Sequence, residues 1–276
     1  MKRKLTFMRV ATYVVAIVAA VVIAFPLYIL LLLALVPPKY TIYSAHPPLL
    51  PPSFTLSTIQ TALNTPGFTG AFDLSLEVAF MVGALAIAIG IPTAYGLSRL
   101  GSRLAYGLTT VMFIVNMLPS ITIAIPLTVP FIEAGLYGSP VSIALAQELL
   151  ALPITTFLLL GAFQSLPREI EQSARVDGAS RFTALFGVLV PLILPAIIAS
   201  FLLSWMLSWD ESTFALILSN LNPPTLPVLI FLSATGRGQP TLAIAFSLIA
   251  TIPVIILTVV LQKYLRGEDL ASGIRG

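Results

Sequence analysis

The chain has 276 residues, of which 58% are hydrophobic and 9% are charged, and its mean hydropathy is +1.01. A soluble domain carries about 25% charged residues, so this composition excludes an ordinary soluble protein and indicates an integral membrane protein. The chain has no cysteine and one histidine, His46, which excludes disulfides, thiolate metal sites and multi-histidine catalysis, and we expect neither a metal nor a cofactor in it.

The first 70 residues predict a cytoplasmic N-terminal segment, one membrane span and an external loop. A basic start precedes an apolar run at 11–36, and a spanning helix needs roughly 20 apolar residues. A cleaved signal peptide is the alternative, but this run is longer than the apolar region of such a peptide. The proline-rich segment 37–74 is expected to be an extended, solvent-exposed loop.

Five further apolar runs predict an all-α membrane protein with six transmembrane helices. Three prolines in span three predict kinks or a broken helix that is packed inside protein. The apolar stretch 226–234 is too short to span a bilayer and is expected to be re-entrant or interfacial. Gly83, Gly90 and Gly96 in span two suit close helix packing. The five runs lie at about 76–97, 106–131, 141–163, 192–218 and 241–265.

The basic residues indicate how the spans are oriented, because lysine and arginine concentrate in cytoplasmic segments. With both termini in the cytoplasm, twelve of the fourteen basic residues fall inside, and only Lys39 and Arg237 fall outside. The net charge of +3 is therefore a topology signal, and we expect no nucleic-acid binding. We expect a multi-pass protein of the cell membrane, with a transmembrane domain at 71–265 and a cytoplasmic tail at 266–276.

A charged loop at 167–190 lies between spans four and five and is expected to be cytoplasmic. Glu171 and Arg175 are four apart in the order that supports a helix. The Asp-Gly pair that ends at Gly178 is a helix stop signal, and Ser180 suits the cap of a second helix. The loop therefore predicts a helix, a glycine turn and another helix. One face of the first helix is predicted to hold Ile170, Ser173, Ala174 and Asp177.

This loop resembles the signature E-A-A-x-x-x-G, nine residues, I-x-L-P, of permease subunits of ABC importers. The spacing from Gly178 to Pro191 is met without a gap. In that family the loop is a coupling helix that sits in a cleft of the ATPase subunit. The family's glutamate is Gln172 here, beside Glu171, so a charged ATPase contact is either lost or shifted by one residue. The resemblance assigns ATPase coupling to Glu171, Gln172, Ser173, Ala174, Asp177, Gly178 and Ala179.

Other motifs resemble the carbohydrate, maltose-type branch of these permeases. The D-G-A at 177–179 is usual there, and A-Y-G-L-S-R at 94–99 resembles its A-Y-A-L-A-R. W-D-E at 209–211 resembles its W-N-E-F. The C-terminal residues 262–276 resemble its Q-R-Y…L-T-A-G-A-V-K-G ending, a tail that in the family reaches between the two ATPase subunits.

The resemblance implies the type I ABC importer permease fold and the import of a mono-, di- or oligosaccharide by alternating access. It implies as partners a second, homologous permease, two copies of an ATPase subunit that bind ATP and Mg, and an extracellular sugar-binding protein, besides the lipid bilayer. The chain itself has no P-loop, because none of its lysines follows a glycine, so we expect a transport subunit and not an enzyme.

Three alternatives remain open beside a sugar permease. One is an ABC permease for a non-sugar solute such as polyamine or glycerol phosphate, which shares the loop. Another is an ion-coupled secondary transporter, which relies on acids in the membrane rather than on a structured loop. A membrane enzyme with a metal ranks last, because the acids of the 167–190 loop lie beside basic residues on a helix.

Several polar and aromatic residues within the spans are candidates for a substrate path. Trp205 and Trp209 share a helix face and suit stacking on sugar rings, although an interfacial tryptophan belt is the alternative. Carboxylates inside a span are costly and usually face a cavity or a polar partner. For the polar residues of spans three and four, an interhelical hydrogen bond is the alternative. The candidates are Asn116, Glu148, Trp205, Trp209, Asp210 and Glu211.

Overall fold

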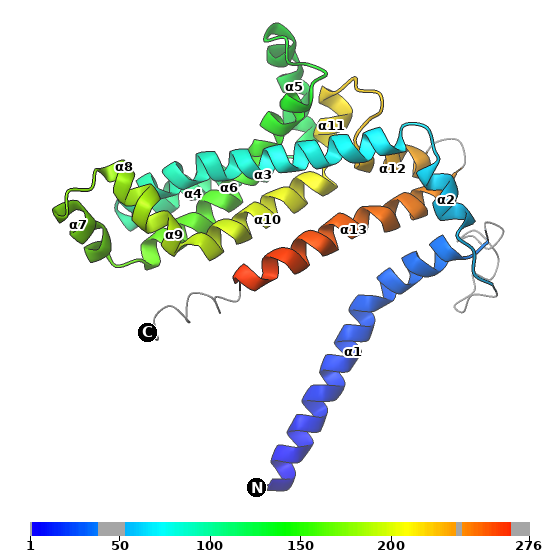
Figure 1. The fold of residues 1–276 in the computed structure, drawn as a ribbon, viewed down its shortest axis with the longest axis horizontal. Helices are drawn as coiled ribbons and strands as arrows, with labels where there is room; N and C mark the ends of the chain where they lie inside the picture. Colours follow the sequence, from blue (N-terminus) through cyan, green and yellow to red (C-terminus); the bar gives the residue numbers. More distant parts are fainter. Residues whose placement is uncertain (1, 38–52, 236–238, 266–276) are drawn as a thin grey trace. The chain divides into compact units, whose positions relative to one another are not determined.

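A computed structural model describes residues 2–37, 53–235 and 239–265, and within these ranges every regular element is a helix (Figure 1). The predicted tail at 266–276, like His46, Lys39 and Arg237, lies outside the described residues. The chain divides into two compact units, which are Met1–Phe68 with Ile230–Ile252, and Thr69–Leu229 with Pro253–Gly276.

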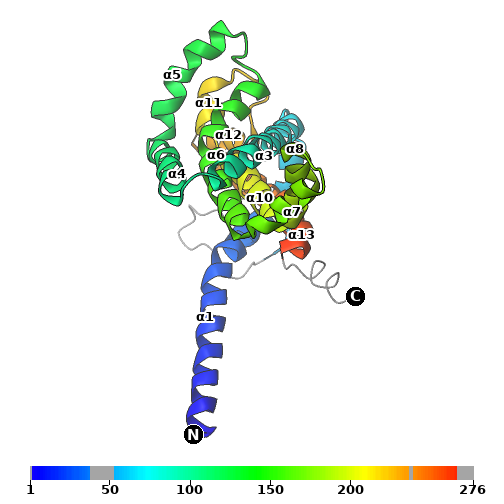
Figure 2. The same cartoon turned by 90° about the vertical axis from the view of Figure 1, so that its left-hand side faces the viewer.

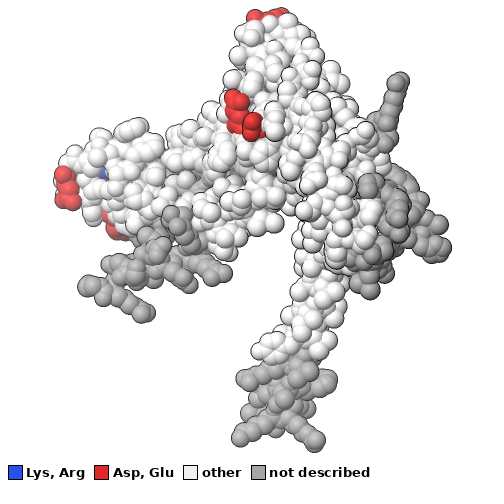
Figure 3. All heavy atoms as spheres, turned by 45° about the vertical axis from the view of Figure 1, so that its right-hand side comes forward, with Lys and Arg blue, Asp and Glu red and all other residues white. Residues whose placement is uncertain are grey.

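The described helices confirm the all-α membrane fold that the apolar runs predict. Four helices are long and apolar enough to cross a membrane, or up to six if each of two bent pairs is one span. The surface drawn in Figure 3 carries few charged groups, which suits contact with lipid. The single helices are Thr12–Leu35, Phe68–Ser98, Pro140–Ser165 and Pro240–Gln262. The bent pairs are Ser102–Asn116 with Ser120–Glu133, and Arg181–Leu192 with Leu194–Asp210.

The first unit contains α1 (Lys2–Leu35) and α2 (Ser57–Leu63). The backbone N–H of Thr55 donates to the backbone oxygen of Leu35 at 2.7 Å and ties the two helices together. The prediction that 37–74 is wholly extended is wrong for its described part. Residues 57–63 contain no proline and bury the side chains of Thr58 and Ala62, which explains why they form a helix.

The second unit is built on α3 (Phe68–Ser98), α6 (Pro140–Ser165) and α10 (Leu194–Asp210), which run side by side in Figure 1. Residues from α3 and α6 share one buried cluster with the segment that leads into α10. This cluster contains Ile91, Ala94, Leu97, Leu159, Leu160, Phe163, Leu185, Leu189 and Ile193.

Glycines let α3 approach its neighbours closely at two positions. A Cβ added at Gly90 would lie 2.7 Å from Cγ2 of Thr155, and one at Gly83 would lie 2.6 Å from Cε2 of Phe201. The close packing that we predicted for these two glycines is therefore confirmed. For Gly96 it is wrong, because a Cβ there would meet nothing within 4 Å.

The bent pair α4 (Ser102–Asn116) and α5 (Ser120–Glu133) turns by 91° just before and at Pro119 (Figure 2). Proline removes a backbone donor and disfavours helical geometry in the residue before it, and the predicted break is confirmed. The prediction that this span is packed inside protein is wrong for this chain, because only Ala105, Thr109 and Ala124 of the two helices are buried. Pro126 and Pro130 lie inside α5, which continues through them.

Predicted span five ends earlier than its hydropathy indicates. Helix α10 stops at Asp210, and Glu211 is extended, with φ −78° and ψ 127°. The apolar residues that follow form a separate short helix, α11 (Thr213–Leu218), which packs on α5. The prediction of one helix through 218 is wrong, because the Glu211 carboxylate accepts hydrogen bonds from the first backbone N–H groups of α11.

The predicted short apolar piece is a helix, α12 (Leu226–Thr235), and the last long helix is α13 (Pro240–Leu265). The start of α12 belongs to the second unit, and within it the Leu226 N–H donates to Oγ of Ser75 at 2.7 Å. Whether α12 is re-entrant stays a prediction.

Candidate functional site

The 167–190 loop begins with α7 (Arg168–Val176), which ends in a glycine turn. Gly178 has φ +92°, a left-handed conformation that residues with a Cβ rarely adopt. Its N–H donates to the Arg175 oxygen at 3.1 Å, and the N–H of Ala179 donates to the Ala174 oxygen at 3.0 Å. This pair of bonds is a Schellman motif, so the predicted stop signal is confirmed.

A second helix follows the turn, as predicted. The Ser180 Oγ accepts from the N–H of Thr183 at 3.1 Å and caps α8 (Arg181–Ala184). A short π-helix, η1 (Leu185–Leu189), and α9 (Val190–Leu192) continue α8 without a gap. The segment Arg181–Leu192 meets α10 at an angle of 80°. The loop is therefore joined directly to a membrane helix.

The inner face of α7 differs from the prediction. Ile170 and Ala174 are half-buried, and Ile170 packs against the α3–α6 cluster, whereas Ser173 and Asp177 are exposed. The third half-buried residue is Glu171 rather than an apolar one. The predicted face is therefore wrong in two of its four members, because a polar interaction places Glu171 against α3.

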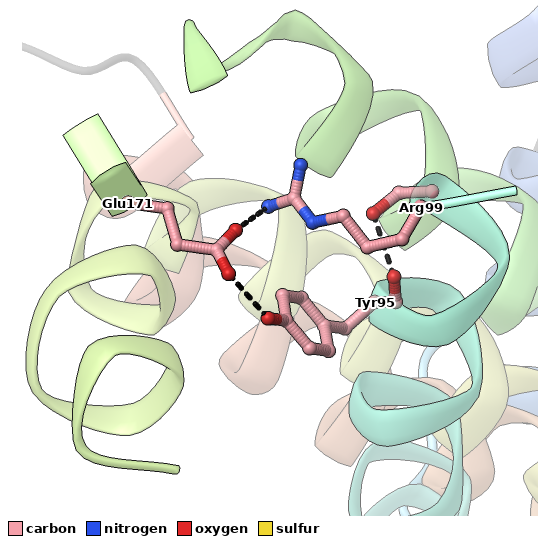
Figure 4. Close-up of polar contacts among 4 residues, drawn as sticks. Tyr95, Arg99 and Glu171 are labelled. Carbon is pink, nitrogen blue, oxygen red and sulfur yellow. Dashed lines mark hydrogen bonds and ion pairs between the residues drawn. The ribbon is translucent and has the colours of Figure 1, made fainter. Parts of the chain in front are cut away.

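Glu171 bonds to two residues at the end of α3 (Figure 4). Its Oε2 lies 2.5 Å from Nη2 of Arg99, and its Oε1 accepts from the hydroxyl of Tyr95 at 2.6 Å. The helix-internal pair of Glu171 with Arg175 is therefore not the interaction that this structure contains. The sequence reasoning missed Tyr95 and Arg99 as members of the site, although the 94–99 motif places them four apart.

The outer side of the loop carries both polar and apolar groups. Gln172, like Ser173 and Asp177, is exposed, and none of the α7 side chains is fully buried. Two large apolar side chains stand out from the loop, Val176 at 87% exposed and Phe182 at 71% exposed. Neither side chain is covered by the described part of this chain.

The two tryptophans of α10 lie inside the protein. Trp205 is 1% and Trp209 is 3% exposed, and their rings stack with centroids 5.0 Å apart. Phe80 packs edge-on against Trp205, and Phe72 packs edge-on against Trp209. An interfacial belt is therefore wrong for this pair, and neither ring offers a free face to a sugar in this structure.

Glu211 belongs to a hydrogen-bond network, whereas Asp210 is exposed. Glu211 accepts from the N–H of Thr213 at 2.7 Å and from Nε2 of Gln147 at 3.2 Å. Ser208 in turn donates to Oε1 of Gln147 at 2.5 Å. Gln147 was not among the predicted residues, although a glutamine inside an apolar run is itself a signal of a polar partner.

The remaining two candidates differ in their contacts. The amide of Asn116 donates to the backbone oxygen of Leu150 at 3.2 Å, which is the interhelical hydrogen bond that we gave as the alternative. Glu148 is 4% exposed, and neither of its carboxylate oxygens has a partner among the described residues. Within those residues no group of three or more acids and histidines could hold a metal ion.

Apolar helices of spanning length, joined by a structured polar loop, define a multi-pass membrane protein. The family profile "Binding-protein-dependent transport system inner membrane component" matches residues 86–267, which is more than half of the chain. The chain belongs to this family. It is a permease subunit of an ABC importer, an inner-membrane transport component and not an enzyme.

Named relatives agree with this assignment. The chain is 34% identical over 205 residues to the sulfoquinovosyl glycerol transport system permease protein SmoH of Agrobacterium fabrum (strain C58 / ATCC 33970). The matched region covers 73% of this chain and 72% of the relative. It is 28% identical to the diacetylchitobiose uptake system permease protein DasC of Streptomyces coelicolor (strain ATCC BAA-471 / A3(2) / M145), over the full length of both.

A solved structure shares the fold. A chain of a bacterial ABC transporter involved in the import of the acidic polysaccharide alginate superposes with a TM-score of 0.74 and 20% identity. The match covers 94% of this chain and 96% of that chain. The predicted ABC importer permease fold is therefore confirmed.

Proposed function

We propose that this permease moves a carbohydrate across the cell membrane and that the 167–190 loop is its contact with a separate ATPase subunit. The carbohydrate is supported by the relatives, which are named for a sugar glycoside and for diacetylchitobiose. The maltose-type motifs at 94–99, 177–179 and 209–211 support the same branch. An ATPase pair would bind ATP and Mg, and a second permease and a sugar-binding protein would complete the assembly.

The observation that carries the coupling proposal is the exposed apolar side chains of a helix–turn–helix loop. Val176 and Phe182 lie on either side of the Gly178 turn, and Phe186 packs on Phe182 with ring centroids 4.5 Å apart. Burying such side chains in a cleft of a partner stabilises the contact by roughly 1.5–3 kcal/mol each. With Gln172 in place of a glutamate, we infer that apolar burial and neutral hydrogen bonds hold the ATPase more than an ion pair does.

The helices adjoining the loop provide a route for movement into the membrane. The loop continues through η1 and α9 into α10, and its Ile170 packs on the cluster of α3 and α6. A displacement of the loop by the ATPase would therefore move three membrane helices together. The distribution of basic residues supports a cytoplasmic location for both termini and for this loop.

Site-specific crosslinking tests the ATPase contact. The chain has no cysteine, so Val176→Cys introduces a single site for a photoactivatable maleimide in native membranes. Leu63→Cys in α2, an exposed apolar residue on the side predicted to be external, is the matched control. The proposal expects an ABC ATPase crosslinked to position 176 and none to position 63. An ATPase at neither position, in a complex that contains one, would refute the loop as the contact.

A second experiment tests the substrate class. The binding protein that accompanies this permease is screened by calorimetry against sugars, polyamines and glycerol phosphate. Its ligand is then tested for stimulation of ATPase activity in the reconstituted complex. Binding and stimulation by a mono-, di- or oligosaccharide are expected. Stimulation by a polyamine or by glycerol phosphate alone would leave the ABC permease assignment intact and contradict the carbohydrate.

A further inference from the structure

We propose that Tyr95, Arg99 and Glu171 form a clasp that makes the end of α3 move with α7. In this proposal Glu171 is a positioning residue inside the permease and not a contact to the ATPase. The inference rests on the proposed coupling function of the 167–190 loop. It identifies the end of α3 as the part of the membrane domain to which that loop is bonded. The three side chains meet where the last turn of α3 faces the first turns of α7 (Figure 4).

The Glu171 carboxylate is fully engaged within the chain. One oxygen binds the Arg99 guanidinium and the other accepts the Tyr95 hydroxyl, and the Glu171 side chain is 13% exposed. Hydrogen bonds between ionised partners are short and about twice as strong as neutral ones. A partner protein would have to break these bonds to reach the carboxylate. The shifted ion pair to the ATPase that the sequence left open is therefore disfavoured.

The α3 half of the clasp is itself held in place. Tyr95 lies in the last turn of α3, and Arg99 directly follows the helix in a turn, where its N–H donates to the Gly96 oxygen at 3.1 Å. The Arg99 guanidinium lies 5.0 Å from the centre of the Tyr95 ring, which adds a cation–π contact. The Tyr95 ring packs edge-on against the buried Phe163 of α6 at 5.8 Å. The clasp therefore joins α7 to the α3–α6 cluster and not merely to a free side chain.

Helix α7 contacts two other elements, η1 and α8, and both follow it in the loop. None of its residues is fully buried, and Ile170 is its one described side chain packed on the α3–α6 cluster. Apolar contacts are non-directional, so a single such residue permits sliding. An ion pair with defined donor and acceptor atoms fixes the register of the two helices. Glu171 also lies in the first turn of α7, where a negative charge favours the helix dipole.

The clasp predicts a specific pattern among substitutions in the assembled transporter. Arg99→Gln removes the positive charge that follows α3, and Tyr95→Phe removes one hydroxyl while keeping the ring on Phe163. The charge swap Arg99→Glu with Glu171→Arg restores an ion pair with opposite polarity, and the tyrosine hydroxyl can then accept instead of donate. Arg103→Gln removes an exposed charge from the neighbouring turn and is the matched control.

The first readout is transport coupling, measured as uptake of the sugar bound by the partner binding protein per ATP hydrolysed. Arg99→Gln is expected to lower this ratio about fivefold, the lower end of usual coupling effects. Tyr95→Phe is expected to lower it less, and the charge swap to recover most of it. Arg103→Gln should match the parent. No recovery in the charge swap, or an equal loss in Arg103→Gln, would overturn the clasp.

The second readout does not depend on the substrate. Spin labels are attached at Leu100→Cys and Glu169→Cys, both exposed, in a complex with cysteine-free partners. The distance between the labels is compared in the ADP state and the vanadate-trapped ATP state. With the clasp intact we expect the same distance in both states, and with Arg99→Gln a shifted or broadened distribution. A distance that is insensitive to Arg99→Gln overturns the clasp.

Failure of the clasp and failure of the coupling function are distinguishable. If the loop is not the coupling element, crosslinking from position 176 finds no ATPase, whatever occupies position 99. If the loop couples but the clasp does not act, the crosslink persists and both readouts above stay at the parent values. Should Arg99→Gln prevent assembly, Tyr95→Phe and the charge swap still decide the outcome.

Discussion

Substitution of Gly178 should uncouple ATP hydrolysis from transport in a graded way. Its φ of +92° costs an L-residue about 1–2 kcal/mol, and an added Cβ would meet nothing within 4 Å, so backbone strain is the whole effect for Gly178→Ala. That energy lowers the population of the turn by a factor of about 5–30. Gly178→Asn should stay near the parent, because asparagine also ends helices in this conformation.

Gly178→Pro should be the most severe change. Proline fixes φ near −65° and removes the N–H that donates to the Arg175 oxygen, so the Schellman turn cannot form. Gly101 provides the matched control, since it has φ −63° in another polar turn and open space around an added Cβ. Gly101→Ala should therefore behave like the parent protein.

The assay measures ATPase rate and sugar uptake on the same proteoliposomes, with thermal unfolding as the test of the membrane helices. We expect uptake per ATP to fall in the order asparagine, alanine, proline, with the unfolding temperature nearly constant. Parent-level uptake per ATP in Gly178→Pro would refute the reasoning that the turn transmits movement. A loss of uptake that tracks a lower unfolding temperature would refute the claim that the effect is local.

Three further predictions concern packing, hydrogen bonding and metal. Gly90→Leu should lower the unfolding temperature, because overpacking against Thr155 costs typically about 1–3 kcal/mol. Gly96→Leu on the same helix should leave it unchanged, because the added side chain meets nothing nearby. Equal effects of the two substitutions would contradict the packing. Glu211→Ala should cost about 1–3 kcal/mol by leaving buried donors unpaired, and exposed Asp210→Asn should cost little. Removing Mg with a chelator should stop ATP-driven uptake without changing the unfolding temperature of the permease, since its described residues contain no acid cluster for a metal.

Local chemistry explains why so much of the loop could be predicted from sequence. The turn at Gly178 and the cap at Ser180 depend on residues within five positions of each other, so their signals are visible in the sequence. The spans were predicted for a similar reason, because crossing a bilayer requires roughly 20 apolar residues in one run. Pro119 likewise indicated a break, although the 91° angle depends on packing.

The features that sequence did not predict depend on contacts between distant residues. Tyr95 and Glu171 are 76 positions apart, so nothing local shows that they bond. The predicted end of α10 was wrong because the residues of α11 are also apolar. Hydropathy alone does not show the hydrogen bonds of Glu211 that separate the two helices. The shared face of Trp205 and Trp209 was visible from their spacing, but the phenylalanines that cover them come from α3.

The most direct test of the central claim is ATP-dependent uptake by the purified complex in proteoliposomes. The tagged chain is purified with its associated subunits, reconstituted, and supplied with its loaded binding protein. The account predicts uptake that requires ATP on the side of the membrane where the ATPase subunits lie. Ionophores should not affect this uptake. Uptake that persists without ATP and collapses with a proton or sodium gradient would contradict it and would indicate a secondary transporter.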